Sequence, residues 1–116
     1  MATIVKWPGK SGITYDSEAF PFGTVFNKVS GVYIVSRKIL SGSHEALYVG
    51  ETESLFDRLN AGEKTHEGIA RVRQYGITHI CVVRVTGNSE RLRVETDLRH
   101  GLNPVGNAQR VPGGWL

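Results

Sequence analysis

The sequence predicts a single α+β domain in which a small, mostly antiparallel sheet of three strands is flanked by helices. Two strand-like segments, 31–36 and 45–49, are separated by a glycine-containing turn that is typical of a hairpin. Helical patterns follow the second of these strands, and another follows a third strand over 79–86. A chain of 116 residues is long enough to bury one core of this kind.

Residues 1–30 show no sustained helical or strand period. The turn signals WPG at 7–9 and FPFG at 20–23 interrupt this segment, although it is rich in aromatic residues. We therefore expect an irregular N-terminal arm that packs on the domain. The domain itself is expected to span 31–110, and 111–116 are expected to form a C-terminal tail.

Alternation of side chains defines the two faces of the predicted hairpin. In its first strand, Val32 and Ile34 are expected on one face, and Tyr33 and Val35 on the other. Two helices should follow, one carrying Leu55, Phe56 and Leu59, and one spanning roughly 65–74 and ending before a glycine.

The last predicted helix begins with Ser89 as its cap and carries the apolar stripe Leu92, Leu98 and Leu102. Glu95 lies on the same face, so its carboxylate points at the body of the protein. A buried charge must be compensated, and both a metal ion and an arginine can do so. The helix alone favours an ion pair, for which the candidates are Arg58, Arg91 and Arg99.

Composition excludes few functions. The net charge of +3 and the pI of about 9.2 are only mildly basic and are weak support for nucleic-acid binding. The single cysteine, Cys81, lies in a strand-like run and is expected to be a buried structural thiol, which excludes an internal disulfide. We find no secretory signal or membrane-spanning run, and we expect a cytoplasmic protein without a membrane partner.

The order of five features carries a resemblance to a known family. These are GVY at 31–33, YVG at 48–50, Arg58, Glu95 and Asn107. The set resembles the GIY-YIG nuclease family and covers residues 31 to about 107. The resemblance implies a GIY-YIG-like fold and an endonuclease that hydrolyses DNA phosphodiester bonds with one divalent cation, Mg²⁺ or Mn²⁺.

The resemblance also implies roles for individual residues. Glu95 would bind the metal, Arg58 would contact the scissile phosphate, and a tyrosine would activate the attacking water. Tyr33 is the favoured base, Tyr48 would position the water or phosphate, and His66 would assist. Supporting roles are implied for Gly31, Gly50 and Asn107.

Each of these residues also has an ordinary structural interpretation. Tyr33 and Tyr48 could simply pack in strands, Arg58 could be a surface charge, and His66 could cap a helix or lie at the surface. Glu51 stands where some family members carry lysine, and pairing with Arg58 would withdraw that arginine from phosphate. The alternative function is therefore a catalytically inactive module of the same fold that binds nucleic acid or protein.

The expected partner is DNA, either duplex or branched. No separate recognition module is evident, so a homodimer or a recruiting protein partner could supply specificity. Four basic residues outside the motif set are candidates for nucleic-acid binding: Arg37, Lys38, Arg71 and Arg73.

Overall fold

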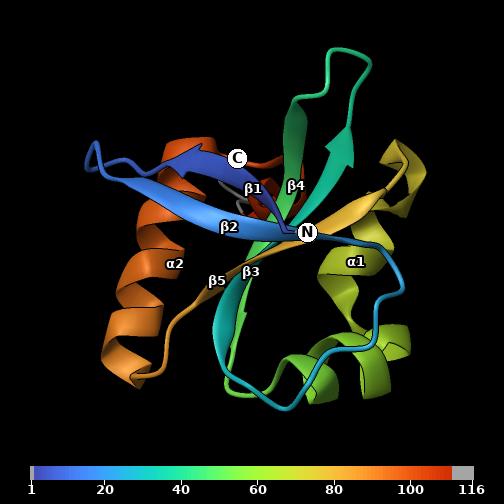
Figure 1. Ribbon diagram of the computed structural model, residues 1–116. Coiled ribbons are helices and arrows are strands. Elements are labelled where there is room, and N and C mark those ends of the chain that lie inside the picture. Colours follow the sequence, from blue (N-terminus) through green and yellow to red (C-terminus); the bar gives the residue numbers. More distant parts are fainter. Residues whose placement is uncertain (1, 111–116) are drawn as a thin grey trace.

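The computed structural model describes residues 2–110 and contains, within them, one five-stranded antiparallel sheet (Figure 1). Its strand order is β1-β2-β5-β3-β4, so that β3 lies between the two strands that follow it in the chain. The α+β class predicted from the sequence is confirmed. The strands are β1 (Thr3–Pro8), β2 (Thr14–Pro21), β3 (Gly31–Lys38), β4 (His44–Thr52) and β5 (His79–Arg84).

Helical segments lie on both sides of this sheet (Figure 1). The α-helices are α1 (Glu67–Val72) and α2 (Asn88–Leu102). Shorter turns are the π-helical η1 (Phe56–Ala61) and the 3-10 turns η2 (Glu63–Thr65), η3 (Arg73–Tyr75) and η4 (Val105–Arg110). No helix in the described part of the chain is both long and apolar enough to cross a membrane.

The predicted irregular arm and three-stranded sheet are wrong, because β1 and β2 extend the sheet to five strands. These outer strands have little apolar alternation, since Trp7 is the one buried residue of β1 and Ser17 the one buried residue of β2. The Trp7 indole N–H donates to the Ser17 hydroxyl at 2.9 Å, and that hydroxyl donates to the Val5 carbonyl at 2.8 Å. Polar pairing therefore joins the two strands where a hydrophobic period is missing. The predicted tail at 111–116 lies outside the described residues.

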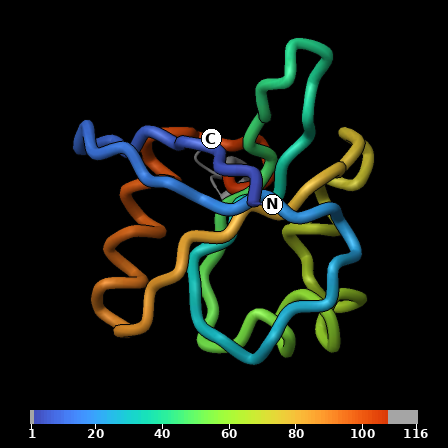
Figure 2. The backbone as a smooth tube through the Cα atoms, in the orientation of Figure 1, coloured from blue at the N-terminus to red at the C-terminus, as the bar shows by residue number. Residues whose placement is uncertain are grey.

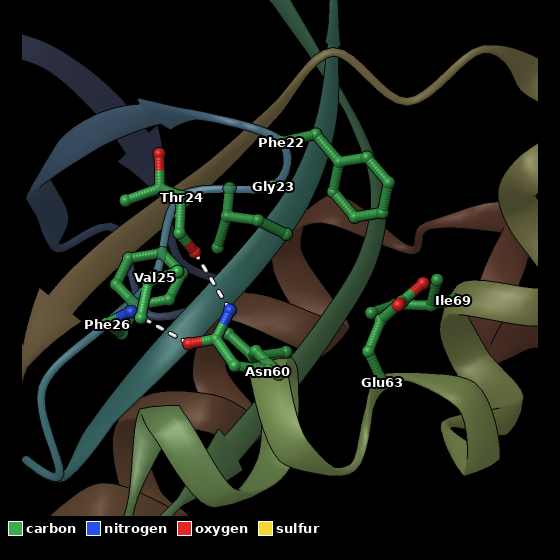
Figure 3. Close-up of a pocket in the computed structure, with 10 residues that line it drawn as sticks. Phe22, Gly23, Thr24, Val25, Phe26, Asn60, Glu63 and Ile69 are labelled. Atoms are coloured by element: carbon green, nitrogen blue, oxygen red, sulfur yellow. Dashed lines mark hydrogen bonds between the residues drawn. The ribbon is translucent and has the colours of Figure 1, made fainter.

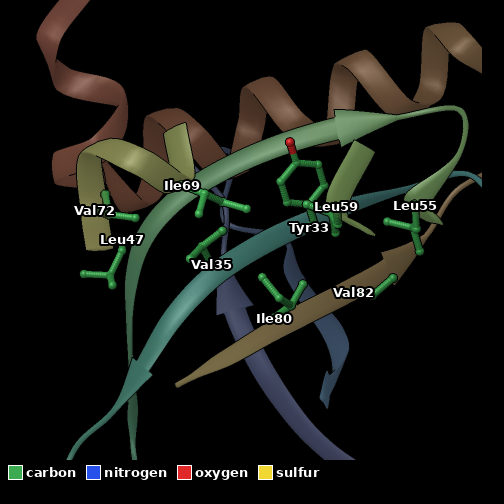
Figure 4. Packing of buried hydrophobic residues seen from close by; sticks show 9 residues of the cluster. All are labelled: Tyr33, Val35, Leu47, Leu55, Leu59, Ile69, Val72, Ile80 and Val82. Carbon is green, nitrogen blue, oxygen red and sulfur yellow. The ribbon is translucent and has the colours of Figure 1, made fainter. Parts of the chain in front are cut away.

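The two faces of β3 build two separate cores, as the alternation predicts. Tyr33 and Val35 pack with Leu59 of η1 and Ile69 of α1 in one cluster (Figure 4). On the opposite face, Val32 and Ile34 pack against α2 in a second cluster. Its buried members include Val32, Ile34, Val49, Cys81, Val94 and Leu98. The predicted buried thiol at Cys81 is thereby confirmed.

Helix α2 packs on the sheet through Leu98 and Leu102 as predicted, but not through Leu92. Arg91, Val94 and Leu98 are buried, whereas Leu92 is 53% exposed. The helix starts at Asn88 after Gly87, and no side chain caps it, so the predicted Ser89 cap is wrong. The prediction failed because an arginine occupies one core-facing position, and a hydrophobic pattern does not signal a buried charge.

The predicted second helix is divided into α1 and η3, with Gly76 ending the segment at a φ of 84°. Its start is set by His66, whose side chain accepts a hydrogen bond from the Ile69 backbone N–H. His66 is therefore a capping histidine, and at 1% exposure it is buried, which excludes the surface interpretation.

The connection between β2 and β3 runs beside the helical segment that follows β4 (Figure 2). Asn60 joins the two, because its amide oxygen accepts from the Phe26 N–H at 2.7 Å and its amide nitrogen donates to the Thr24 carbonyl at 2.9 Å (Figure 3). Asn60 also lines a cavity of about 310 Å³, together with residues that include Phe22 and Ile69.

Candidate active site

Three aromatic rings that are distant in sequence meet beside β3 and β4. Tyr33 comes from β3, Tyr48 from β4, and His66 from the residue before α1. The ring centroids of the tyrosines are 6.3 Å apart, and the His66 centroid lies 5.7 Å from that of Tyr33 and 5.3 Å from that of Tyr48. The structure thus brings together three of the five residues to which the resemblance assigns catalytic roles.

A short hydrogen bond joins Tyr33 and His66. The Tyr33 hydroxyl oxygen and His66 Nε2 are 2.6 Å apart. His66 Nδ1 accepts from the Ile69 N–H at 3.2 Å, so in a neutral ring the hydrogen is on Nε2. His66 is therefore the donor and the Tyr33 oxygen the acceptor, which leaves the phenolic hydrogen of Tyr33 directed elsewhere.

The environment keeps both groups uncharged at rest. Burial, reinforced by the Arg58 guanidinium, lowers the pKa of His66 to about 4. Burial also raises the pKa of Tyr33, with a further contribution from Tyr48, while Arg58 lowers it. Desolvation outweighs the arginine, so Tyr33 is a protonated phenol at neutral pH.

Two glycines make room for the rings. Gly50 is opposite Tyr33 in the β3–β4 register, and a Cβ there would lie 2.5 Å from the Tyr33 hydroxyl oxygen. Gly68 in α1, which the sequence analysis missed, is equally close to the Tyr48 ring, at 2.5 Å. The available signal was a glycine inside a predicted helix. Glycine there costs about 1 kcal/mol relative to alanine, so its presence suggests that close packing excludes a side chain.

Gly31 has a different neighbour. A Cβ at this position would lie 2.9 Å from the Val83 carbonyl oxygen of β5, so the glycine permits close approach of two strands. Its role is in the sheet and not in the ring cluster.

Arg58 lies in η1 and is partly buried. Its guanidinium acts electrostatically on both Tyr33 and His66, which places a permanent positive charge beside the ring cluster. Glu51 forms its ion pair with Arg91, at 2.7 Å between Oε1 and Nε. Glu51 therefore pairs with Arg91 and not with Arg58, the pairing that would have withdrawn Arg58 from phosphate.

Glu95 belongs to α2 and forms an ion pair on that helix. Its side chain is 13% exposed, and its Oε2 accepts from Arg99 Nε at 3.0 Å. Helix α2 packs on one face of the sheet and the tyrosines belong to the cluster on the other. Within residues 2–110, no hydrogen bond, ion pair or ring contact joins Glu95 to the ring cluster. The ion pair with Arg99 was one of the three structural interpretations of this residue.

The donor set limits how a metal can bind. In the described part of the chain, no group of three or more His, Cys, Asp or Glu side chains could hold a metal ion. Mg²⁺ is commonly held by one or two carboxylates together with retained water and substrate phosphate. Glu95 fits a cation only in that form, as the single protein ligand in a site completed by phosphate and water.

Asn107 supports the edge strand from outside the sheet. Its amide oxygen accepts from the Val49 N–H at 2.8 Å, and its amide nitrogen donates to the Val49 carbonyl at 3.0 Å. The side chain thus pairs with β4 as a neighbouring strand would, between Tyr48 and Gly50. This contact agrees with the supporting role that the resemblance implies.

Of the candidate nucleic-acid contacts, Arg71 acts electrostatically on His66 of the ring cluster. Three of these four basic residues form ion pairs with acidic neighbours: Arg37 with Glu45, Arg71 with Glu67, and Arg73 with Glu63. Arg73 also lies over the Phe22 ring, 5.6 Å from its centroid. These partners neutralise much of the charge that was expected to attract phosphate.

The fold and the ring cluster define a small α+β domain with a tyrosine–histidine pair beside an arginine. Comparisons with models of known protein families, with curated proteins and with solved structures found no match. The activity of the site is therefore inferred from the geometry of this chain and from the ordered motif.

Proposed function

We propose that this protein is a metal-dependent endonuclease that hydrolyses phosphodiester bonds in DNA. The observation that supports this most strongly is the Tyr33–His66 hydrogen bond of 2.6 Å, with Arg58 acting on both groups. A tyrosine held by a hydrogen-bond donor next to a fixed positive charge is suited to accept a proton near a phosphate.

The chain's own groups have distinct tasks in this proposal. The donated hydrogen bond from His66 favours the phenolate form of Tyr33, and Arg58 favours it further, in opposition to burial. Tyr33 is 1% exposed, whereas Tyr48 is half-buried, so Tyr48 positions the water or phosphate with the proton of the water directed at the Tyr33 oxygen. Arg58 stabilises the charge that develops on the phosphate oxygens.

Hydrolysis then requires two proton transfers. The water oxygen bonds to phosphorus as one proton of the water passes to the Tyr33 phenolate, and the bond from phosphorus to the 3′ oxygen breaks as that oxygen takes a proton from solvent. A divalent cation held by Glu95 would supply charge neutralisation at the phosphate. Because Tyr33 must first lose its own proton, the cleavage rate should rise with pH above neutrality.

The ion pair of Glu51 favours the enzyme over the inactive module. An inactive module was expected to show Glu51 paired with Arg58, and the Glu51 carboxylate pairs with Arg91 instead. Arg58 therefore remains beside Tyr33 and His66, where it can meet phosphate.

Nicking of supercoiled plasmid tests the proposal, with Mg²⁺ or Mn²⁺ and then with EDTA. Glu95→Gln should abolish cleavage, whereas Glu90→Gln, an exposed acid on the same helix, should leave it unchanged. Arg58→Ala should slow cleavage about 10²- to 10³-fold, as expected for loss of one charge-stabilising donor. Its control is Arg84→Ala on exposed β5 surface.

The outcomes separate the alternatives. Cleavage retained by Glu95→Gln would remove Glu95 from the mechanism, and an unchanged rate for Arg58→Ala would make that residue a surface charge. If the wild-type protein does not cut DNA but still binds it in a gel-shift assay, the protein is a binding module.

A further inference from the structure

Two histidines outside the candidate active site face each other where the β3–β4 hairpin leaves the sheet. His44 is the first residue of β4, and His79 is the first residue of β5. Their ring centroids are 4.9 Å apart and their planes make an angle of 78°. Neither ring takes part in the tyrosine–histidine cluster, and the sequence alone assigned neither a function.

Each ring is oriented by a hydroxyl at its Nδ1. His44 Nδ1 lies 3.0 Å from Ser36 Oγ, and His79 Nδ1 lies 2.8 Å from Thr78 Oγ1. Ser36 can accept from His44 because its own hydrogen can point to Cys81 Sγ, 3.7 Å away. Thr78 Oγ1 already accepts from the Lys38 backbone N–H at 2.7 Å, and its second lone pair is available to His79 Nδ1. With both Nδ1 atoms donating, both Nε2 atoms carry free lone pairs. Histidine ligands of metals are commonly held in this way through their second nitrogen.

The ring spacing matches a shared cation. Two imidazoles that bind one tetrahedral ion through nitrogen at about 2.0–2.1 Å have centroids roughly 5 Å apart. The 4.9 Å between His44 and His79 agrees with this separation.

We propose that His44 and His79 form a site for a borderline transition-metal cation such as Zn²⁺, with each ring contributing Nε2 and water completing the coordination. Imidazole ligands suit Zn²⁺, Cu²⁺ and Ni²⁺, whereas Mg²⁺ prefers oxygen ligands. A cation at this point would link the first residues of β4 and β5 across β3. The site is independent of the proposed nuclease activity.

The positive charge of Lys38 should weaken cation binding at this site. Lys38 is opposite His44 in the β3–β4 register, and its positive charge acts on both rings. The same positive charge opposes a bound cation. Lys38→Met should therefore strengthen Zn²⁺ binding, an effect that adventitious binding to scattered surface histidines would not produce.

Isothermal titration of the whole protein with ZnCl₂ tests the proposal, using MgCl₂ as the control titrant. One Zn²⁺ per chain is expected, and His44→Ala and His79→Ala should each weaken binding at least about tenfold. His100→Ala, which removes an exposed histidine at the end of α2, should change nothing. NMR of the wild-type imidazoles provides a second readout, in which the His44 and His79 signals should respond first.

Binding that is equal in wild type and in either alanine variant would overturn the proposal. So would the absence of Zn²⁺ binding by the wild-type protein. If an alanine variant does not fold, the wild-type NMR titration decides, because a response centred on His66 or His100 would place the metal elsewhere.

Discussion

Replacing Glu51 by alanine should destabilise the fold by about 3 kcal/mol, because it leaves a buried guanidinium without its counter-ion. The Arg91 side chain is 5% exposed and that of Glu51 is 29% exposed. Breaking a buried pair generally costs about 3–5 kcal/mol. We expect the lower end, since Arg91 also donates to the Thr86 carbonyl at 3.2 Å and to Asn88.

Urea denaturation, with linear extrapolation to water, measures this change. The matched control is Glu45→Ala, which removes the acid of the Arg37 pair, where the side chains are 45% and 52% exposed. An exposed pair of that kind contributes less than about 1 kcal/mol. If Glu51→Ala and Glu45→Ala cost the same, the argument from burial is refuted, and Arg91 is adequately solvated without its partner.

Three further predictions follow from the ring cluster and from the β1–β2 turn. Gly50→Ala should push the Tyr33 ring aside and cost about 1–3 kcal/mol in unfolding free energy, whereas Gly87→Ala, with open space around it, should cost under about 1 kcal/mol. The His66 ring should titrate with a pKa of about 4 by NMR. Because this pKa lies below the ordinary value near 6.5, the contribution of the neutral ring to stability is fully present above that value and is lost as the pH falls towards 4. A midpoint near 6.5 would contradict the burial of the His66 ring beside Arg58. Hydrogen bonds from Ser11 and Tyr15 lower the pKa of Asp97. Its contribution to stability is therefore present above the unfolded value near 3.9 and is lost on further acidification, so Asp97→Asn should flatten the fall of Tm below about pH 4. An equally steep fall would show that Asp97 does not couple to folding.

The hairpin illustrates what local sequence can predict. Alternation in 31–36 assigned Tyr33 and Val35 to one face and Val32 and Ile34 to the other, and the two clusters confirm it. A strand buried on both faces has few stable registers, because a shift of one residue would exchange the faces.

The outer strands and α2 illustrate what local sequence cannot predict. β1 and β2 are held by the Trp7–Ser17 hydrogen bond and by antiparallel pairing, neither of which leaves a periodic pattern. On α2, a core-facing position is taken by Arg91, whose buried charge is paired with Glu51, 40 positions earlier in the chain. The apolar pattern therefore placed Leu92 on the sheet-facing side of α2, whereas the structure exposes it.

By itself, the sequence determined the α+β class, the faces of the central hairpin and the ordered set of residues that resembles a nuclease site. Only the tertiary structure decided which of those residues meet. It joined Tyr33 to His66 across 33 positions, and it paired Glu95 with Arg99 on a helix that packs against the other face of the sheet. The physical reason is that periodicity records which side of an element is buried, whereas the partner across the interface depends on how distant elements pack.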